Sequence, residues 1–167
     1  MGIIIVDDNP TNIFVIENIL KRAGYKEFIS FTSAIDLFTY FDNKPPMQIG
    51  RQTDIILMDI MMPGMDGIEA CRQLQEFPHL RDIPVIFVTA LEDTNKVVEA
   101  LDAGGMDYVT KPINKTELLA RIRVALRLKY EKDWHIEQDE KIRTELELSM
   151  QVQTSLLSEP VYQNNVI

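Results

Sequence analysis

The chain has 167 residues, of which 46% are hydrophobic, so it is long enough for one globular domain and a further segment and is not intrinsically disordered. Its formal net charge of −9 disfavours binding to nucleic acid or to an anionic membrane. The single cysteine excludes a disulfide framework, and no apolar run reaches membrane-spanning length, so we expect a cytoplasmic protein.

Short apolar runs alternate with amphipathic segments along residues 2–126. The first run, GIIIV, is typical of a strand buried on both faces of a parallel sheet. Asn9 and Pro10 then suit the N-cap and the first position of a helix. In chain order, we expect strands at 2–6, 26–31, 54–58, 84–88 and 106–109, and helices between Pro10 and Gly24, after Ser33, over 66–77, over 94–103 and from Asn114 onward.

One long segment interrupts the alternation. Residues 42–53 contain Pro45, Pro46 and Gly50, which favour irregular structure, and we expect a surface loop there. The remaining pattern, five strands that alternate with five helices, predicts an α/β fold with a doubly wound parallel sheet. Ligands of such sheets bind beyond the carboxyl ends of the strands.

Polar side chains follow four of the expected strands directly. They are Asp7 and Asp8 after the first strand, Asp59 after the third, Thr89 after the fourth and Lys111 after the fifth. Clustered carboxylates repel one another unless a cation lies among them, and hard oxygen ligands suit Mg²⁺. A carboxylate can also attack phosphorus, and a lysine can stabilise the charge of the phosphoryl group. The sequence therefore predicts a magnesium-assisted phosphoryl-transfer site.

Four segments resemble the receiver domain of two-component response regulators. They are VDDNP at 6–10, DIILMDIMMPGMDGIEA at 54–70, PVIFVTA at 84–90 and AGGMDYVTKP at 103–112. The resemblance implies a flavodoxin-like receiver over residues 1–127 that accepts a phosphoryl group from a histidine kinase or phosphotransfer protein. A receiver of this kind is a phosphoacceptor that phosphorylates itself from a donor, and the chain itself is not expected to be an enzyme of another kind.

The resemblance also implies a role for each matched residue. Asp59 is the phosphoacceptor, and Thr89 and Lys111 contact the phosphoryl group. Tyr108 is the aromatic residue that rotates when the switch changes state, and the Lys111–Pro112 peptide bond is usually cis in this family. The implied Mg²⁺ ligands are Asp7, Asp8, Asp59 and the main-chain carbonyl of Met61.

Each of these residues also has a simpler interpretation. Asp7 and Asp8 alone could cap a helix, Lys111 alone could be a solvated charge, and Tyr108 could be an ordinary core aromatic. A receiver that has lost phosphorylation is a further alternative. The placement of polar residues at four strand ends together favours the phosphoryl-transfer site.

The chain continues beyond the expected receiver as one helical pattern. Residues 114–157 contain neither proline nor glycine, and a continuous helix of that span would be roughly 65 Å long. Apolar and polar residues both lie along a weak heptad seam. We expect residues 128–158 to form a signalling helix that dimerises as a coiled coil. A partly disordered linker is the alternative. The seam positions are Leu128, His135, Ile142, Ser149 and Leu156, with Lys132, Asp139, Leu146 and Gln153 as companions.

The last part of this pattern has a second resemblance. Residues 145–161 (ELELSMQVQTSLLSEPV) are similar to the helix that precedes the metal-dependent serine/threonine phosphatase domain of sporulation and general-stress response regulators. This resemblance implies that residues 159–167 begin an output domain lying beyond the sequence, with an anti-sigma-factor antagonist as its substrate. A cyclic-dinucleotide cyclase output and a stand-alone docking module are the alternatives.

Overall fold

The computed structural model describes residues 2–90 and 92–157, which form five strands and six helices. The strands are β1 (Ile3–Val6), β2 (Phe28–Phe31), β3 (Ile55–Met58), β4 (Val85–Thr89) and β5 (Asp107–Thr110). The helices are α1 (Pro10–Arg22), α2 (Ala34–Asp42), α3 (Pro46–Gln52), α4 (Gly67–Glu76), α5 (Thr94–Asp102) and α6 (Lys115–Leu157).

All five strands are parallel, in the order β2-β1-β3-β4-β5. This order confirms the predicted doubly wound sheet, in which the chain runs outward from β1 first to one edge and then to the other. The central strands β1 and β3 are the apolar runs IIIV and IILM, and every residue in them is buried. Their continuous hydrophobicity arises because helices cover both faces of the sheet.

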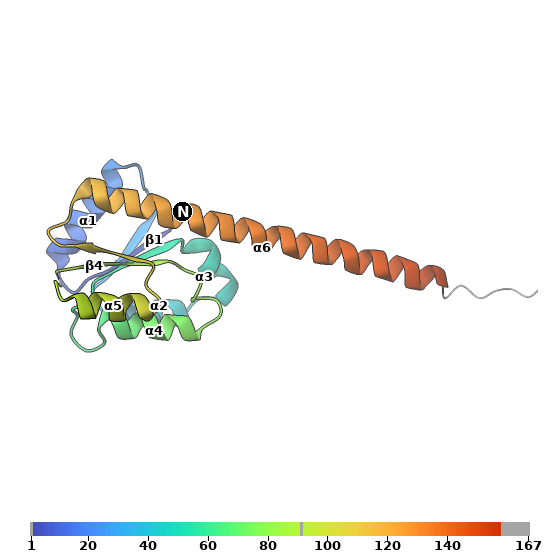
Figure 1. Ribbon diagram of the computed structural model, residues 1–167, viewed down its shortest axis with the longest axis horizontal. Helices are drawn as coiled ribbons and strands as arrows, with labels where there is room; N and C mark the ends of the chain where they lie inside the picture. Colours follow the sequence, from blue (N-terminus) through green and yellow to red (C-terminus); the bar gives the residue numbers. More distant parts are fainter. Residues whose placement is uncertain (1, 91, 158–167) are drawn as a thin grey trace, which may run out of the picture. The chain divides into compact units, whose positions relative to one another are not determined.

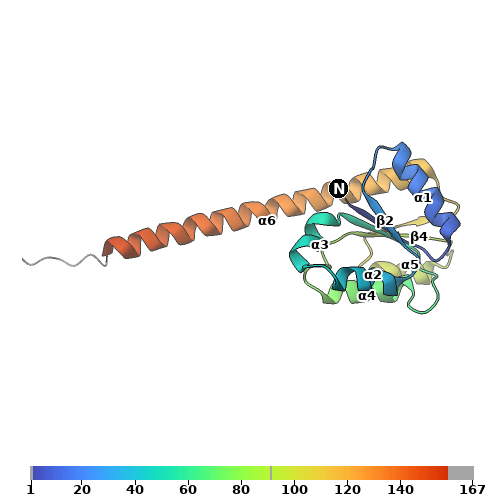
Figure 2. The same ribbon diagram turned by 180° about the vertical axis from the view of Figure 1, so that it is seen from behind.

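The two faces of the sheet carry separate hydrophobic clusters. Alternate strand residues such as Ile5 and Leu57 pack with α1 and the first part of α6, whereas Val6 and Met58 pack with α2, α3, α4 and α5. Figures 1 and 2 show these two helical layers on opposite sides of the strands. The period-2 alternation of strand side chains thus assigns each strand residue to one cluster.

The predicted helix starts are confirmed by their capping bonds. The side chain of Asn9 accepts a hydrogen bond from Thr11, and that of Ser33 accepts one from Asp36. Side-chain oxygens at these positions satisfy main-chain N–H groups that have no partner inside the helix. After α1, Gly24 has a φ of 92°, a left-handed conformation that ends the helix and that a residue with a Cβ adopts only with strain.

The predicted loop at residues 42–53 was wrong, because this segment contains helix α3. Pro46 occupies the first helical turn, where its missing N–H is not needed. Ile49 is 1% exposed and packs into the cluster formed with α2 and α4. Burial of this one side chain therefore favours a helical turn in a segment whose local composition predicts irregular structure.

The chain divides into two units, Met1–Lys129 and Tyr130–Ile167. The first contains the sheet, helices α1 to α5 and the beginning of α6, and the described part of the second is the continuation of α6. The expected output-domain start at 159–167 lies outside the described residues. Within the described residues, no helix has an apolar stretch long enough to cross a membrane.

Candidate phosphoryl-transfer site

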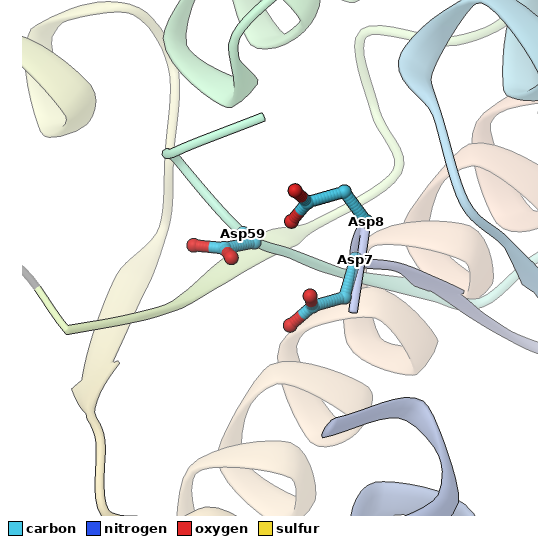
Figure 3. A group of neighbouring side chains, drawn as sticks. All are labelled: Asp7, Asp8 and Asp59. Carbon is cyan, nitrogen blue, oxygen red and sulfur yellow. The ribbon is translucent and has the colours of Figure 1, made fainter. Parts of the chain in front are cut away.

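The candidate site lies at the carboxyl ends of the two central strands. Asp7 and Asp8 directly follow β1, and Asp59 directly follows β3. The main-chain N–H of Asp59 donates to the carbonyl of Val6 over 2.9 Å, which aligns the two strand ends. Figure 3 shows the three carboxylates converging from these ends.

The three aspartates have the geometry of a divalent-cation site. One carboxylate oxygen from each of Asp7, Asp8 and Asp59 lies within 4.8 Å of the others. Asp7 and Asp59 are buried, at 1% and 6% exposure, whereas Asp8 is exposed to solvent. Hard oxygen ligands with one side open to water match the preference of Mg²⁺, which keeps several water ligands. The donor set therefore fits magnesium.

Lys111 joins the two buried carboxylates. Its Nζ lies 2.9 Å from Oδ2 of Asp7 and 3.1 Å from Oδ2 of Asp59. Burial lowers the pKa of Lys111, but the hydrogen bonds to Asp7 and Asp59 and the negative charges of both carboxylates together outweigh burial and raise this pKa above the ordinary lysine value. Lys111 follows β5 and precedes a cis peptide bond to Pro112, as the family resemblance implied.

Opposing effects act on the pKa of the Asp59 carboxyl group. Burial raises its pKa above the ordinary aspartate value, and the negative charge of Asp7 acts in the same direction. The hydrogen bond and positive charge of Lys111 oppose this rise, as does the N–H of Met61, which donates to Oδ1 over 3.3 Å. A partly desolvated carboxylate beside a lysine has the properties of a positioned nucleophile.

The remaining predicted residues lie on or beside the same edge of the sheet. Thr89 is the fully buried last residue of β4, and its register partner on β5 is Thr110. Tyr108 is two residues earlier on β5, half-buried against the cluster on the α5 side of the sheet. Met61 directs its N–H toward Asp59, and the residue as a whole is 62% exposed.

Two residues that support the site were not predicted. The Asn12 amide donates to Oδ1 of Asp7 over 3.4 Å, from the first turn of α1. Gly67 begins α4 so close to β3 that an added Cβ would lie 2.1 Å from the carbonyl oxygen of Asp59. The glycine directly after the helix-capping Asp66 was the available signal, because a glycine there permits close approach of two main chains.

Comparisons with known proteins agree on one family. The family model for the response regulator receiver domain matches residues 3–123. The response regulator PleD of Caulobacter vibrioides is 38% identical over 127 residues, which is 76% of this chain and 26% of PleD. The transcriptional regulatory protein SpaR of Bacillus subtilis is 36% identical over 125 residues, which is 75% of this chain and 51% of SpaR. The chain thus spans about half or less of the length of these curated relatives.

Solved structures give the same result. The signal receiver domain of a signal transduction histidine kinase from Syntrophus aciditrophicus is 33% identical, with a TM-score of 0.65 over 75% of this chain and 89% of that one. The BeF3-activated DrrB receiver domain is 28% identical, with a TM-score of 0.63 over 75% of this chain and 97% of that one. Both similarities thus cover three quarters of this chain.

Proposed function

The chain belongs to the response regulator receiver domain family, and we propose that its Asp59 accepts a phosphoryl group from the histidine of a kinase or phosphotransfer protein. The observation that supports this assignment most directly is the bridge from Lys111 to both Asp7 and Asp59. This bridge brings Lys111 together with Asp7, 104 positions away in the sequence, and with Asp59, 52 positions away, at one edge of the sheet.

The transfer step follows from the position of Asp59. A carboxylate oxygen of Asp59 forms a bond to phosphorus while the bond between phosphorus and the donor imidazole nitrogen breaks. The bonding electrons stay on that nitrogen, which then takes up a proton, and Asp59 becomes an acyl phosphate. Lys111, 3.1 Å from the accepting carboxylate, is placed to stabilise the charge of the phosphoryl oxygens.

Asp7, Asp8 and Asp59 are the side chains that would hold magnesium, together with the main-chain carbonyl of Met61. When bound there, the ion supplies positive charge that offsets the repulsion between the carboxylates and the incoming phosphoryl group. The residues contribute differently: Asp7 is fixed by Lys111 and by the N–H of Asn9, whereas Asp8 is exposed. Asp8 is therefore able to adjust to a ligand.

Thr89 and Tyr108 are proposed to carry the change away from the site. The Thr89 hydroxyl would bind a phosphoryl oxygen, and the half-buried Tyr108 ring would rotate toward the space that Thr89 leaves. Their places on adjacent strands, with Tyr108 opposite Phe87 and Thr89 opposite Thr110, support a coupling between the two side chains. Phosphorylation can shift this equilibrium only by the contacts that it adds in the active state.

Acetyl phosphate with Mg²⁺ tests the acceptor. Asp59→Asn and Asp59→Ala should abolish phosphorylation, measured by intact-protein mass spectrometry or Phos-tag electrophoresis. Asp139→Asn is the control, because this aspartate is exposed on α6 and outside the site. Labelling that persists in the Asp59 variants would refute the site, and loss of labelling in the control would remove the basis for the comparison.

Met61 bears on the lifetime of the acyl phosphate. A thioether positions a hydrolytic water poorly, and the residue at this place beside Asp59 is largely exposed. We therefore expect slow self-hydrolysis, followed as loss of the phosphorylated species after removal of the donor. A lifetime of seconds or less in the isolated chain contradicts this expectation.

The proposed output of the switch is dimerisation through residues 130–152 of α6. One line of this helix is polar throughout, which marks a face for solvent: Asp133, Glu137, Glu140, Thr144, Glu147 and Gln151, spaced alternately by four and three residues. The opposite face contains His135, Ile142 and Leu146, which belong to the predicted seam. Beryllofluoride with Mg²⁺ should change the dimer dissociation constant measured by analytical ultracentrifugation; an unchanged constant contradicts this coupling.

We further propose that the full-length protein carries a serine/threonine phosphatase output acting on an anti-sigma-factor antagonist, and that it is cytoplasmic. The similarity of residues 145–161 to the helix preceding such phosphatases supports the output. A cyclic-dinucleotide cyclase output is the second candidate, since a signalling helix suits either enzyme. The coding sequence after Ile167 distinguishes them: phosphatase aspartates support the first, and a cyclase motif supports the second.

A further inference from the structure

The buried face of α6 ends in a charged residue. The residues that α6 packs against the sheet are apolar and at most 4% exposed: Leu118, Ile122, Ala125 and Leu126. Lys129 follows Leu126 by three positions, on the same face of the helix, and is only 5% exposed. Every described residue from Tyr130 to Val152 is exposed or half-buried. Among the residues of α6 up to Val152, a cation thus occupies the last buried position.

The ammonium group of Lys129 lies at the C-terminal end of α3. Its Nζ donates to the main-chain carbonyl of Gly50 over 3.4 Å. Gly50 belongs to the last turn of α3, where the carbonyl groups have no partner inside the helix. A cation at this end also interacts favourably with the helix dipole. Lys129 therefore caps α3 from a distant part of the sequence.

Helix α3 has little intrinsic stability of its own. It has seven residues, far fewer than an isolated helix needs in water. Its N-cap, Pro45, makes no side-chain hydrogen bond, and Ile49 is its single buried residue. The buried Ile49 side chain and the Lys129 cap are thus two contacts that hold α3 against distant parts of the first unit, whereas the bond from Lys44 to Gln52 (2.9 Å) is local.

The end of α3 is joined to the strand that carries the phosphoacceptor. Thr53 and Asp54 connect α3 to β3, whose last residue precedes Asp59. This connection is fixed by two hydrogen bonds: the N–H of Asp54 donates to the carbonyl of Gly2 over 2.8 Å, and the N–H of Gly2 donates to Oδ2 of Asp54 over 2.7 Å. A movement of β3 along its own axis would therefore displace the end of α3.

We propose that Lys129 is the positioning residue of the output helix: by capping α3 it fixes the point at which α6 leaves the first unit, and it ties that point to β3. The tie to signalling rests on the proposed function, because it concerns how phosphorylation of Asp59 reaches residues 130–152. The fixing of α6 by α3 does not depend on phosphorylation.

Hydrogen–deuterium exchange tests the cap directly. Lys129→Met keeps the apolar stem of the side chain and removes the donor. The amides of α3 and of residues 126–130 should then exchange about tenfold faster, because the partly buried, charge-assisted hydrogen bond to Gly50 is lost. Lys129→Arg, which keeps the cation, should restore slow exchange, and the exposed Lys132→Met should leave it unchanged. Unchanged exchange in Lys129→Met, or an equal rise in Lys132→Met, overturns the proposal.

Two further measurements separate this proposal from the proposed function. In an Ile49→Ala background, where α3 has lost its other anchor, Lys129→Met should add little to the exchange rate; a full additional increase would show that Lys129 acts independently of α3. Lys129→Met should be labelled by acetyl phosphate as the unaltered chain is, but its beryllofluoride-induced change in dimer dissociation constant should shrink severalfold. A fully retained change overturns the tie to signalling. Failure of the unaltered chain to be labelled refutes Asp59 as acceptor, whereas the role of Lys129 at α3 is still decided by the exchange rates.

Discussion

The two parts of α6 share one backbone geometry but are stabilised differently. Residues 115–129 carry five basic side chains and one acidic side chain, whereas residues 130–152 carry three basic and seven acidic. The first part places a continuous apolar stripe against the sheet, including Leu118 and Ile122 at 0% exposure. In the second part the large apolar residues are 42% to 65% exposed, from Ile136 to Met150.

This difference shows that helix formation and helix stabilisation are separate matters. The first part is helical because burial of its apolar stripe contributes free energy that helix propensity alone does not supply. The second part contains no proline or glycine and thus meets the local requirements for a helix, but its apolar side chains are not buried within its own unit. Such a helix gains its stability from a partner, and in our proposal this partner is a second copy.

The largest expected difference between the two parts concerns a matched pair of isoleucines. Ile122→Ala should lower the free energy of unfolding by about 2–5 kcal/mol, because it leaves a cavity in the core. Ile142→Ala should change the unfolding of the dilute, monomeric chain by at most about 0.5 kcal/mol, since Ile142 is 54% exposed. Urea denaturation at low protein concentration measures both values. Equal losses would mean that residues 130–152 fold as part of the receiver unit.

The same contrast explains which features were predictable from the sequence. The strands β1 and β3 were recognisable because their residues are apolar throughout, and Asp7, Asp59 and Lys111 were recognisable because each follows a strand directly. Helix α3 was not recognisable, because its formation depends on the burial of Ile49 and on the bond from Lys129 to Gly50, which lie 79 positions apart. Asn12 was missed for the same reason: its role depends on the orientation of Asp7, which no local pattern encodes.

Stabilisation by Mg²⁺ should depend on the carboxylates of the first unit and not on those of the second. At a magnesium concentration one hundred times the dissociation constant, binding should stabilise the unaltered chain by about 2.7 kcal/mol. Asp8→Asn should lose most of this stabilisation while retaining the metal-free stability, because the bridge from Lys111 to Asp7 and Asp59 does not include Asp8. Thermal unfolding with and without Mg²⁺ measures the effect. Glu140→Gln, on the solvent face of α6, is the control, and an equal loss there would place the metal outside the site.

A smaller effect should follow from the pKa of Asp59. Because the pKa of Asp59 is raised in the folded chain, the native state binds a proton on its carboxylate more tightly than the unfolded state does. The stability that Asp59 contributes is therefore present at low pH and is lost as pH rises through the folded pKa. Asp59→Asn should therefore unfold at a higher temperature than the unaltered chain near pH 7, without Mg²⁺. The difference should vanish as pH falls to about 4, the ordinary aspartate value. An Asn variant that is less stable at pH 7 would show that the attraction of Lys111 outweighs burial. Asp139→Asn on α6 should show no such pH-dependent difference.

The smallest expected effect concerns salt and the dimer. Two parallel copies of residues 130–152 bring like charges together, because each copy has more acidic than basic side chains. Raising the ionic strength from about 0.05 to 0.5 M shortens the screening length to well under 10 Å, so dimerisation should strengthen a few-fold. Glu131 and Glu145 lie near the seam, on the side of the helix opposite the polar line, and their repulsion should dominate. The double variant Glu131→Gln, Glu145→Gln should therefore dimerise more tightly at low salt and lose most of the salt dependence. Glu140→Gln, on the polar line, should behave as the unaltered chain does in analytical ultracentrifugation. A dimer that weakens with salt would instead mean that opposite charges meet across the interface. The basic residues 115–129 or an antiparallel arrangement would then contribute to the interface, and the seam assigned to the second part of α6 would be wrong.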